Sequence, residues 1–308
     1  QTCALPIFTE IKKAPVSSDN PDAVLQAVEE TSLPTVIFKK PGDTTQPSWS
    51  GGTITSDDLP LDASISGVEG GDRLRFAIII ENKGAGAKGA FDLTLQDVIP
   101  TGLHTIADGA DADAYSDVNI QIFNGAGESF TYTALGGGPD GIDGTPDDLF
   151  GNGIRIDDPS PLQGACQAHL VGEGKNIIIV TYDLQVGDTV SAGTILTNKG
   201  KLLKYSSTDG GENFLEGPLL DTGESDIAGP EIEKILFDTA IDAAGNPANR
   251  AVIGETARYH VRITLPEGST ESLVLTDTLP EGLDYDDYRL ITTAAGSGGD
   301  LASDFAGT

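Results

Sequence analysis

Apolar and polar side chains alternate along most of this chain with a period of two, which is typical of β-strands with one buried face. Residues 259–265 show the alternation clearly, and residues 194–202 and 118–123 repeat it. The β-branched run at 176–184 has the composition of a central strand buried on both faces. Only residues 22–30 favour a turn or two of helix. Short strands separated by Gly, Pro and Asp turns predict an all-β fold of Greek-key β-sandwiches.

Three sequence blocks occur twice in the same order, which indicates an internal repeat. The most similar pair matches in its Asp, Pro, Gly and final Leu positions. The first copies span residues 34–39, 71–80 and 93–103, and the second copies span 230–234, 254–263 and 273–283.

The repeat suggests how the chain is divided. Residues 1–7 match the translation of a common sequencing adapter, so we exclude them from the fold. We interpret residues 8–33 as the tail of a preceding repeat plus a linker. Residues 34–206 are expected to form one complete sandwich repeat with inserted acidic loops, and residues 207–229 a linker. Residues 230–308 are expected to form a second sandwich repeat that is truncated at its C-terminus.

Composition narrows the function classes. The 308 residues include 18 basic and 48 acidic side chains, for a formal charge of −30. Such a surface lacks the positive footprint that nucleic-acid or anionic-membrane binding requires. No stretch approaches the roughly 18 apolar residues of a membrane span, so we expect no membrane insertion. We expect a soluble, acidic, extracellular β protein.

Three motifs, in order, point to a known family. They are Gly71–Phe76 (Gly-Asp-Arg-Leu-Arg-Phe), Asp97–Leu103 (Asp-Val-Ile-Pro-Thr-Gly-Leu) and Leu196–Asn198 (Leu-Thr-Asn). The pattern resembles the immunoglobulin-like repeat of large prokaryotic surface proteins and the related isopeptide-forming fimbrial backbone domains. The resemblance implies tandem immunoglobulin-like sandwiches in a cell-surface stalk or adhesin. Its expected partners are neighbouring repeats of the same chain and a surface protein or glycan of a host or neighbouring cell.

Some domains of this family contain a spontaneous Lys–Asn amide bond. The reaction needs a buried, neutral lysine amine, an asparagine amide within reach and a buried, protonated carboxyl group. The resembling residues are Lys39, Asp97 and Asn198 in the first unit and Lys234 and Asp277 in the second. Lys39 is favoured over Lys40 because it shares a strand face with Ile37. Alternatively, the aspartates only shape strand ends and the lysines are solvated.

A second candidate chemistry is calcium binding in the Gly-rich loop 139–148. Its four carboxylates are Asp140, Asp143, Asp147 and Asp148. Calcium prefers several carboxylate and carbonyl oxygens on a flexible turn, although this loop does not follow the EF-hand spacing. The alternative is an acidic loop that only aids solubility.

The remaining residues do not indicate an enzyme. The three histidines are scattered without zinc-ligand spacing, and Cys166 lacks the sequence context of a nucleophile. We therefore expect a structural stalk or adhesin segment without turnover. Two alternatives stay open: a carbohydrate- or protein-binding sandwich, and a spacer attached to an extracellular enzyme.

Overall fold

The computed structural model describes nine segments of the chain, which are residues 11–26, 36–45, 48–49, 63–84, 88–105, 118–169, 173–241, 250–270 and 272–288. They divide into a larger unit, Gln1–Glu271, and a smaller one, Ser272–Thr308. The predicted adapter residues 1–7 lie outside the described segments. Within these segments, no helix is both long enough and apolar enough to cross a membrane.

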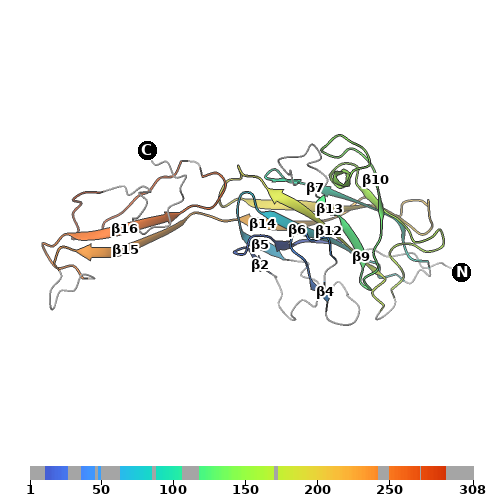
Figure 1. The fold of residues 1–308 in the computed structure, drawn as a ribbon, viewed down its shortest axis with the longest axis horizontal. Coiled ribbons are helices and arrows are strands. Elements are labelled where there is room, and N and C mark those ends of the chain that lie inside the picture. Colours follow the sequence, from blue (N-terminus) through green and yellow to red (C-terminus); the bar gives the residue numbers. More distant parts are fainter. Residues whose placement is uncertain are drawn as a thin grey trace. The chain divides into compact units, whose positions relative to one another are not determined.

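Two β-sheets build most of the larger unit (Figure 1). The five-stranded sheet consists of β1 (Ile11–Ser18), β6 (Arg73–Glu81), β12 (Ile177–Val186), β8 (Leu103–His104) and β9 (Gln121–Asn124). All of its strand pairs are antiparallel.

The seven-stranded sheet consists, in spatial order, of β10 (Tyr132–Ala134), β11 (Ile154–Ile156), β7 (Phe91–Val98), β13 (Ile195–Ser206), β14 (Leu219–Ile227), β5 (Ser64–Val68) and β2 (Val24–Gln26). Its one parallel pair is β14 with β5. Within the helical turn predicted at 22–30, residues 24–26 form the strand β2 instead, because their backbone pairs with β5. The rest of that prediction, residues 27–30, lies outside the described segments. A short 3₁₀-helix, η3 (Pro146–Phe150), begins inside the acidic loop 139–148 and contains its last two aspartates.

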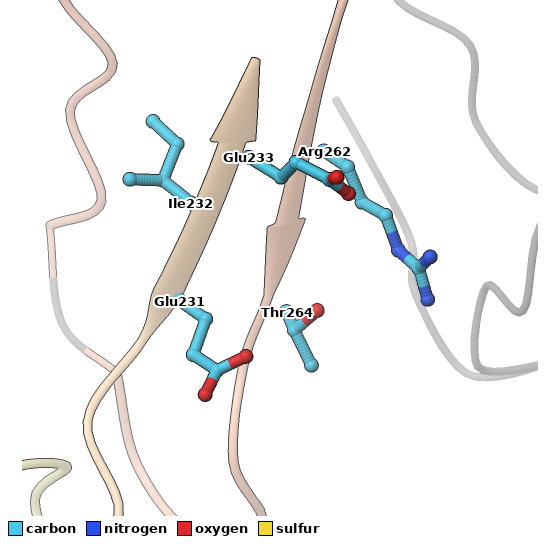
Figure 2. A pocket seen from close by; sticks show the side chains of 5 residues that line it. All are labelled: Glu231, Ile232, Glu233, Arg262 and Thr264. Atoms are coloured by element: carbon cyan, nitrogen blue, oxygen red, sulfur yellow. The ribbon is translucent and has the colours of Figure 1, made fainter. Parts of the chain in front are cut away.

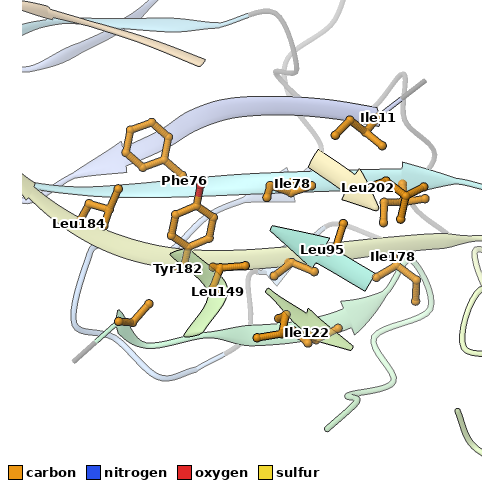
Figure 3. Close-up of a cluster of buried hydrophobic side chains, with 14 of the residues drawn as sticks. Ile11, Phe76, Ile78, Leu95, Ile122, Leu149, Ile178, Tyr182, Leu184 and Leu202 are labelled. Carbon is orange, nitrogen blue, oxygen red and sulfur yellow. The ribbon is translucent and has the colours of Figure 1, made fainter. Parts of the chain in front are cut away.

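The two sheets bury a shared apolar core, which confirms the predicted all-β sandwich. Phe76 and Ile78 of β6 belong to the same buried cluster as Leu95 of β7 and Leu202 of β13 (Figure 3). Alternate residues of β6, such as Ile79, belong instead to a smaller cluster. The predicted burial of β12 on both faces is confirmed, because its residues contribute to both clusters.

Two domain boundaries predicted from the sequence are wrong. Residues 11–18 are not the tail of a preceding repeat, because β1 pairs with β6 along seven residue positions. Residues 219–227 are not a linker, because β14 pairs with both β13 and β5. The sandwich therefore extends at both ends beyond the predicted range 34–206, because sheet pairing joins strands that lie far apart in the sequence.

Further strands of the larger unit lie outside these two sheets. The strands β3 (Val36–Ile37) and β4 (Ser48–Trp49) form a small antiparallel pair. The strands β15 (Glu231–Thr239) and β16 (Ala257–Thr264) form a two-stranded antiparallel sheet. Residues of β15 and β16 line a pocket, which Figure 2 shows. They are Glu231, Ile232, Glu233, Arg262 and Thr264.

The repeated Pro-x-Gly-Leu block forms the same turn in both copies. The Leu103 N–H donates to the Pro100 carbonyl at 3.1 Å, and the equivalent bond between Leu283 and Pro280 measures 3.2 Å. The intervening glycines, at positions 102 and 282, have φ values of 103° and 95°, which only glycine adopts readily. The residues before the turn differ, since 91–98 are a strand and 273–280 are not.

Candidate cross-link site in the sandwich core

A lysine lies in the apolar core between the two sheets. Lys13 is on β1, directly opposite Ile78 of β6, and is 1% exposed. Gly200 of β13 leaves room for its aliphatic stem, because a Cβ at that position would lie 3.2 Å from the Lys13 Cδ. A buried lysine is rare unless it is paired or has a special role, so its neighbours decide how it is interpreted.

The opposite sheet supplies a carboxyl group and a carboxamide. Asp97 of β7 is the register partner of Gly200 on β13, and Asn198 lies two residues before that glycine. Residues two apart on a strand point to the same face, so Asn198 and Gly200 share the inward face of β13. Both side chains are completely buried, at 0% exposure.

The hydroxyl of Tyr182 connects these groups. Tyr182 lies on β12, and its hydroxyl donates to Asp97 Oδ2 at 2.7 Å. It accepts a hydrogen bond from Asn198 Nδ2 at 3.3 Å and another from Lys13 Nζ. Lys13 Nζ also donates to Asp97 Oδ2. One tyrosine oxygen therefore contacts the lysine amine, the asparagine amide and the aspartate.

Burial moves both ionisable partners toward their neutral forms. Burial is the largest influence on Lys13 and lowers its pKa, although the charge of Asp97 opposes the shift. Burial likewise raises the pKa of Asp97, against the influence of Lys13 and of hydrogen bonds from Tyr182 and Asn198. Burial and the Asp97 charge raise the pKa of Tyr182 well above its ordinary value. Both shifts act in the direction of a neutral amine beside a protonated carboxyl group.

Two oxygens at the site accept no hydrogen bond. They are Asp97 Oδ1 and Asn198 Oδ1, and both are buried. A buried polar atom without a partner costs about 1–3 kcal/mol. A protonated Asp97 has a hydroxyl to offer to the Asn198 carbonyl oxygen, and this hydrogen bond would satisfy that oxygen.

The structure brings together two of the three cross-link residues predicted for the first unit. Asp97 and Asn198 lie together, but the lysine beside them is Lys13, so the selection of Lys39 is corrected. The strand β3 ends at residue 37, so the strand parity that favoured Lys39 does not extend to it. Lys39 is half-buried, and its carbonyl accepts a hydrogen bond from the Ser17 hydroxyl at 2.7 Å. Lys40 is exposed.

The cross-link residues predicted for the second sequence repeat, Lys234 and Asp277, lie in different structural units. Lys234 is exposed on β15, with its Nζ 4.8 Å from the centre of the Tyr259 ring. Asp277 is exposed in the smaller unit, in a segment that forms no strand. Neither side chain is buried, whereas the proposed amide-bond chemistry takes place between buried groups.

The aspartates predicted to bind calcium mostly hold the backbone of their own loop. Asp148 is buried, and its carboxylate accepts hydrogen bonds from the N–H groups of Gly136 at 2.8 Å, Gly138 at 3.1 Å and Gly144 at 2.7 Å. These bonds shape the turn that leads into η3.

The other three aspartates of the loop make similar contacts. Asp147 is buried and accepts a bond from the Asp140 N–H at 2.9 Å, while its Oδ1 has no partner. Asp140 and Asp143 accept bonds from the N–H groups of Ile142 and Gly137.

A different set of acidic side chains does gather closely. Among the described residues, Asp92, Asp158 and Asp209 place three carboxylates within 4.8 Å of one another, and the loop aspartates do not. Burial, followed by the charges of Asp92 and Asp209, raises the pKa of Asp158. The Asp92 carboxylate already pairs with Lys204 at 3.3 Å and accepts a bond from the Ser206 hydroxyl at 2.9 Å.

A second buried ion pair has a structural role. Arg75 of β6 and Asp183 of β12 form two hydrogen bonds, of 2.7 and 2.9 Å. The Arg75 guanidinium also donates to the Asp43 carbonyl, and the Gly42 N–H donates to Asp183. The pair thereby fixes the loop after β3 against the five-stranded sheet.

Comparisons with known proteins show only distant likeness. No protein-family model matches the chain, and no curated protein matches it. Similar solved structures include a family 123 glycoside hydrolase from Clostridium perfringens, with 11% identity and a TM-score of 0.24. The major pilin subunit BcpA of Bacillus cereus has 8% identity and a TM-score of 0.30. The collagen adhesin of S. aureus has 10% identity and a TM-score of 0.27.

The extent of these likenesses varies. The matches cover 53%, 65% and 85% of this chain, respectively. In the same order, they cover 22%, 53% and 83% of the other chain, so this chain spans about a fifth of the hydrolase and about half of the pilin subunit. Similarity at this level assigns the chain to no family.

Proposed function

We propose that the sandwich is a structural module of an extracellular surface protein, without enzymatic turnover, whose two sheets are joined by an amide bond between Lys13 and Asn198. The observation that carries this proposal is the burial of a lysine amine, a carboxyl group and a carboxamide around one tyrosine hydroxyl. A buried Lys–Asp pair alone is a weak source of stability. The adjacent carboxamide adds an electrophile for the amine.

The proposed reaction needs no external reagent. Lys13 transfers a proton to Asp97, and the neutral amine Nζ attacks the carboxamide carbon of Asn198. The protonated Asp97 donates a hydrogen bond to the carbonyl oxygen as negative charge develops there. The new C–Nζ bond forms, one proton moves from Nζ to Nδ2, the C–Nδ2 bond breaks, and Nδ2 leaves as ammonia. Each chain reacts once, so this is self-modification rather than turnover.

Such a bond suits a module that bears tension. It would connect β1 of the five-stranded sheet to β13 of the seven-stranded sheet, so the sheets could not separate without breaking a covalent bond. The surface-stalk proposal also agrees with the strongly negative charge, which keeps a crowded array soluble.

Intact-mass spectrometry tests the proposal. We expect the folded protein to weigh about 17 Da less than its sequence predicts, because one ammonia is lost. Lys13→Met should abolish the difference, while the matched control Lys39→Met should retain it. A folded protein whose mass equals the calculated value would rule out the bond. If the difference were lost in Lys39→Met but kept in Lys13→Met, the site would be misassigned.

A further inference from the structure

We propose that Tyr182 is a catalytic residue of this cross-linking reaction, in which its hydroxyl relays a proton from the Lys13 amine to the departing Asn198 nitrogen. The inference rests on the proposed Lys13–Asn198 bond and adds a role for a fourth residue beside the lysine, asparagine and aspartate. Tyr182 contacts both reacting nitrogens, since it accepts hydrogen bonds from Lys13 Nζ and from Asn198 Nδ2.

The reaction requires a proton to move between those two nitrogens. After attack, Nζ carries a proton that the amide product does not need, and Nδ2 needs one to leave as ammonia. Tyr182 lies at both of these nitrogens, because its hydroxyl oxygen accepts a hydrogen bond from Lys13 Nζ and another from Asn198 Nδ2. The tyrosine hydroxyl therefore bridges the proton donor Nζ and the proton acceptor Nδ2 directly.

The relay leaves Tyr182 unchanged. Its hydroxyl proton passes to Nδ2 while a proton from Nζ passes to its oxygen, so one proton enters and one leaves. In the unreacted site this hydroxyl donates to Asp97 Oδ2. Once Asp97 is protonated it no longer requires that bond, and rotation about the C–O bond can direct the hydroxyl toward Nδ2.

Packing holds the hydroxyl in position. The Tyr182 ring stacks on Phe76 with ring centres 6.0 Å apart, and the edge of Phe150 lies against it with centres 5.8 Å apart. Figure 3 shows Tyr182 beside Phe76 within the core. The raised pKa of Tyr182 keeps the hydroxyl protonated at neutral pH, which a relay requires. A merely structural tyrosine would need one buried partner for its hydroxyl, whereas this one has three.

The test compares rates of bond formation. Unreacted chain is recovered from inclusion bodies in guanidinium chloride and refolded by dilution, and the loss of about 17 Da is followed over time. We expect Tyr182→Phe to refold but to form the bond at least about 100-fold more slowly, in the range typical of general acid–base groups. Tyr205→Phe, which removes the hydroxyl of another mostly buried tyrosine, is the control and should react at the wild-type rate.

The outcomes separate the relay from the bond itself. If wild type and Tyr182→Phe lose ammonia at equal rates, the relay is wrong and the Lys13–Asn198 bond stands. If the folded wild type loses none, both proposals fail. Should Tyr182→Phe not refold, a fluorinated tyrosine placed at position 182 keeps the ring and hydroxyl but lowers the hydroxyl pKa. The relay predicts that the alkaline limit of the pH–rate profile moves to lower pH, and an unmoved profile would overturn it.

Discussion

Replacing Lys13 with methionine should lower the stability of the sandwich by the contribution of the cross-link. Methionine keeps an unbranched apolar stem in the space beside Gly200 and Ile78, so the packing changes little. It removes the amine, and with it any bond to Asn198. Asp97 stays buried and keeps the hydrogen bond from Tyr182. The variant therefore isolates the covalent link more cleanly than a truncation to alanine.

The magnitude follows from the loop that the bond closes. Joining residues 13 and 198 closes a loop of about 185 residues, for which the chain-entropy relation used for disulfides gives about 5 kcal/mol. For a domain of this size, each kcal/mol corresponds to about 2–4 °C in Tm. We therefore expect Lys13→Met to melt roughly 10–20 °C below wild type.

Differential scanning calorimetry of wild type, Lys13→Met and Lys39→Met measures this directly. Lys39→Met should melt close to wild type, because Lys39 is half-buried and lies outside the site. If Lys13→Met melted within a few degrees of both, the amine would contribute no covalent constraint and the reasoning from loop closure would be refuted.

Three further predictions concern groups around the site and elsewhere in the sandwich. In Lys13→Met, burial still raises the Asp97 pKa above its ordinary 3.8. Over the pH range between the unfolded and folded pKa values of Asp97, the folded state holds a proton that the unfolded state has lost. The free energy of unfolding, measured in urea, should therefore fall as pH rises from about 4 toward the folded-state pKa of Asp97, by at most about 1.4 kcal/mol per pH unit. A flat profile would show that Asp97 ionises normally. Arg75→Met should cost about 3–5 kcal/mol in urea unfolding, because Asp183 stays buried without its cation, and a loss below 1 kcal/mol would contradict that role. Calcium at ten times its Kd should stabilise the protein by about 1.4 kcal/mol through the loop 139–148. Asp147→Asn should remove this effect, because Asp147 Oδ1 is a buried loop oxygen without a hydrogen-bond partner. An unchanged Tm on calcium addition would exclude the loop as a site.

The sequence pattern was sufficient to predict those features that depend on residues close together in the chain. The β-branched run of β12 predicted burial on both faces because the pattern itself has no polar face. Asp97 and Asn198 were identified from a resemblance in motif order, and the Pro-x-Gly-Leu turn from glycine's access to positive φ. These features depend on residues close in sequence.

Lys13 was not predicted from the sequence, because its burial depends on contacts with residues that are distant in sequence. The sequence of β1 begins Ile-Lys-Lys-Ala-Pro-Val. Its apolar and polar residues do not alternate regularly and it contains a proline, so the pattern does not predict a core strand. Its role follows from pairing with β6, more than 50 residues further along the chain. Only once β1 is placed does parity assign Lys13 to the face of Ile11. The sequence signals that could have indicated Lys13 were this shared face with Ile11 and the presence of Tyr182 on an apolar strand.

The second repeat shows the same dependence on partners. Residues 273–279, which repeat the sequence of part of β7, form no strand, and Val274 there is 81% exposed. Strands gain stability from ladders and a shared apolar face, which isolated pairs supply poorly. A sequence repeat therefore predicts a local turn better than it predicts a sheet.

Peptide mapping of the purified, folded protein is the most direct measurement of the cross-link. After proteolysis, tandem mass spectrometry should find one branched species that joins the peptide containing Lys13 to the peptide containing Asn198, with one ammonia missing from their summed mass. Recovery of both peptides only in linear, unmodified form from fully folded protein would contradict the account.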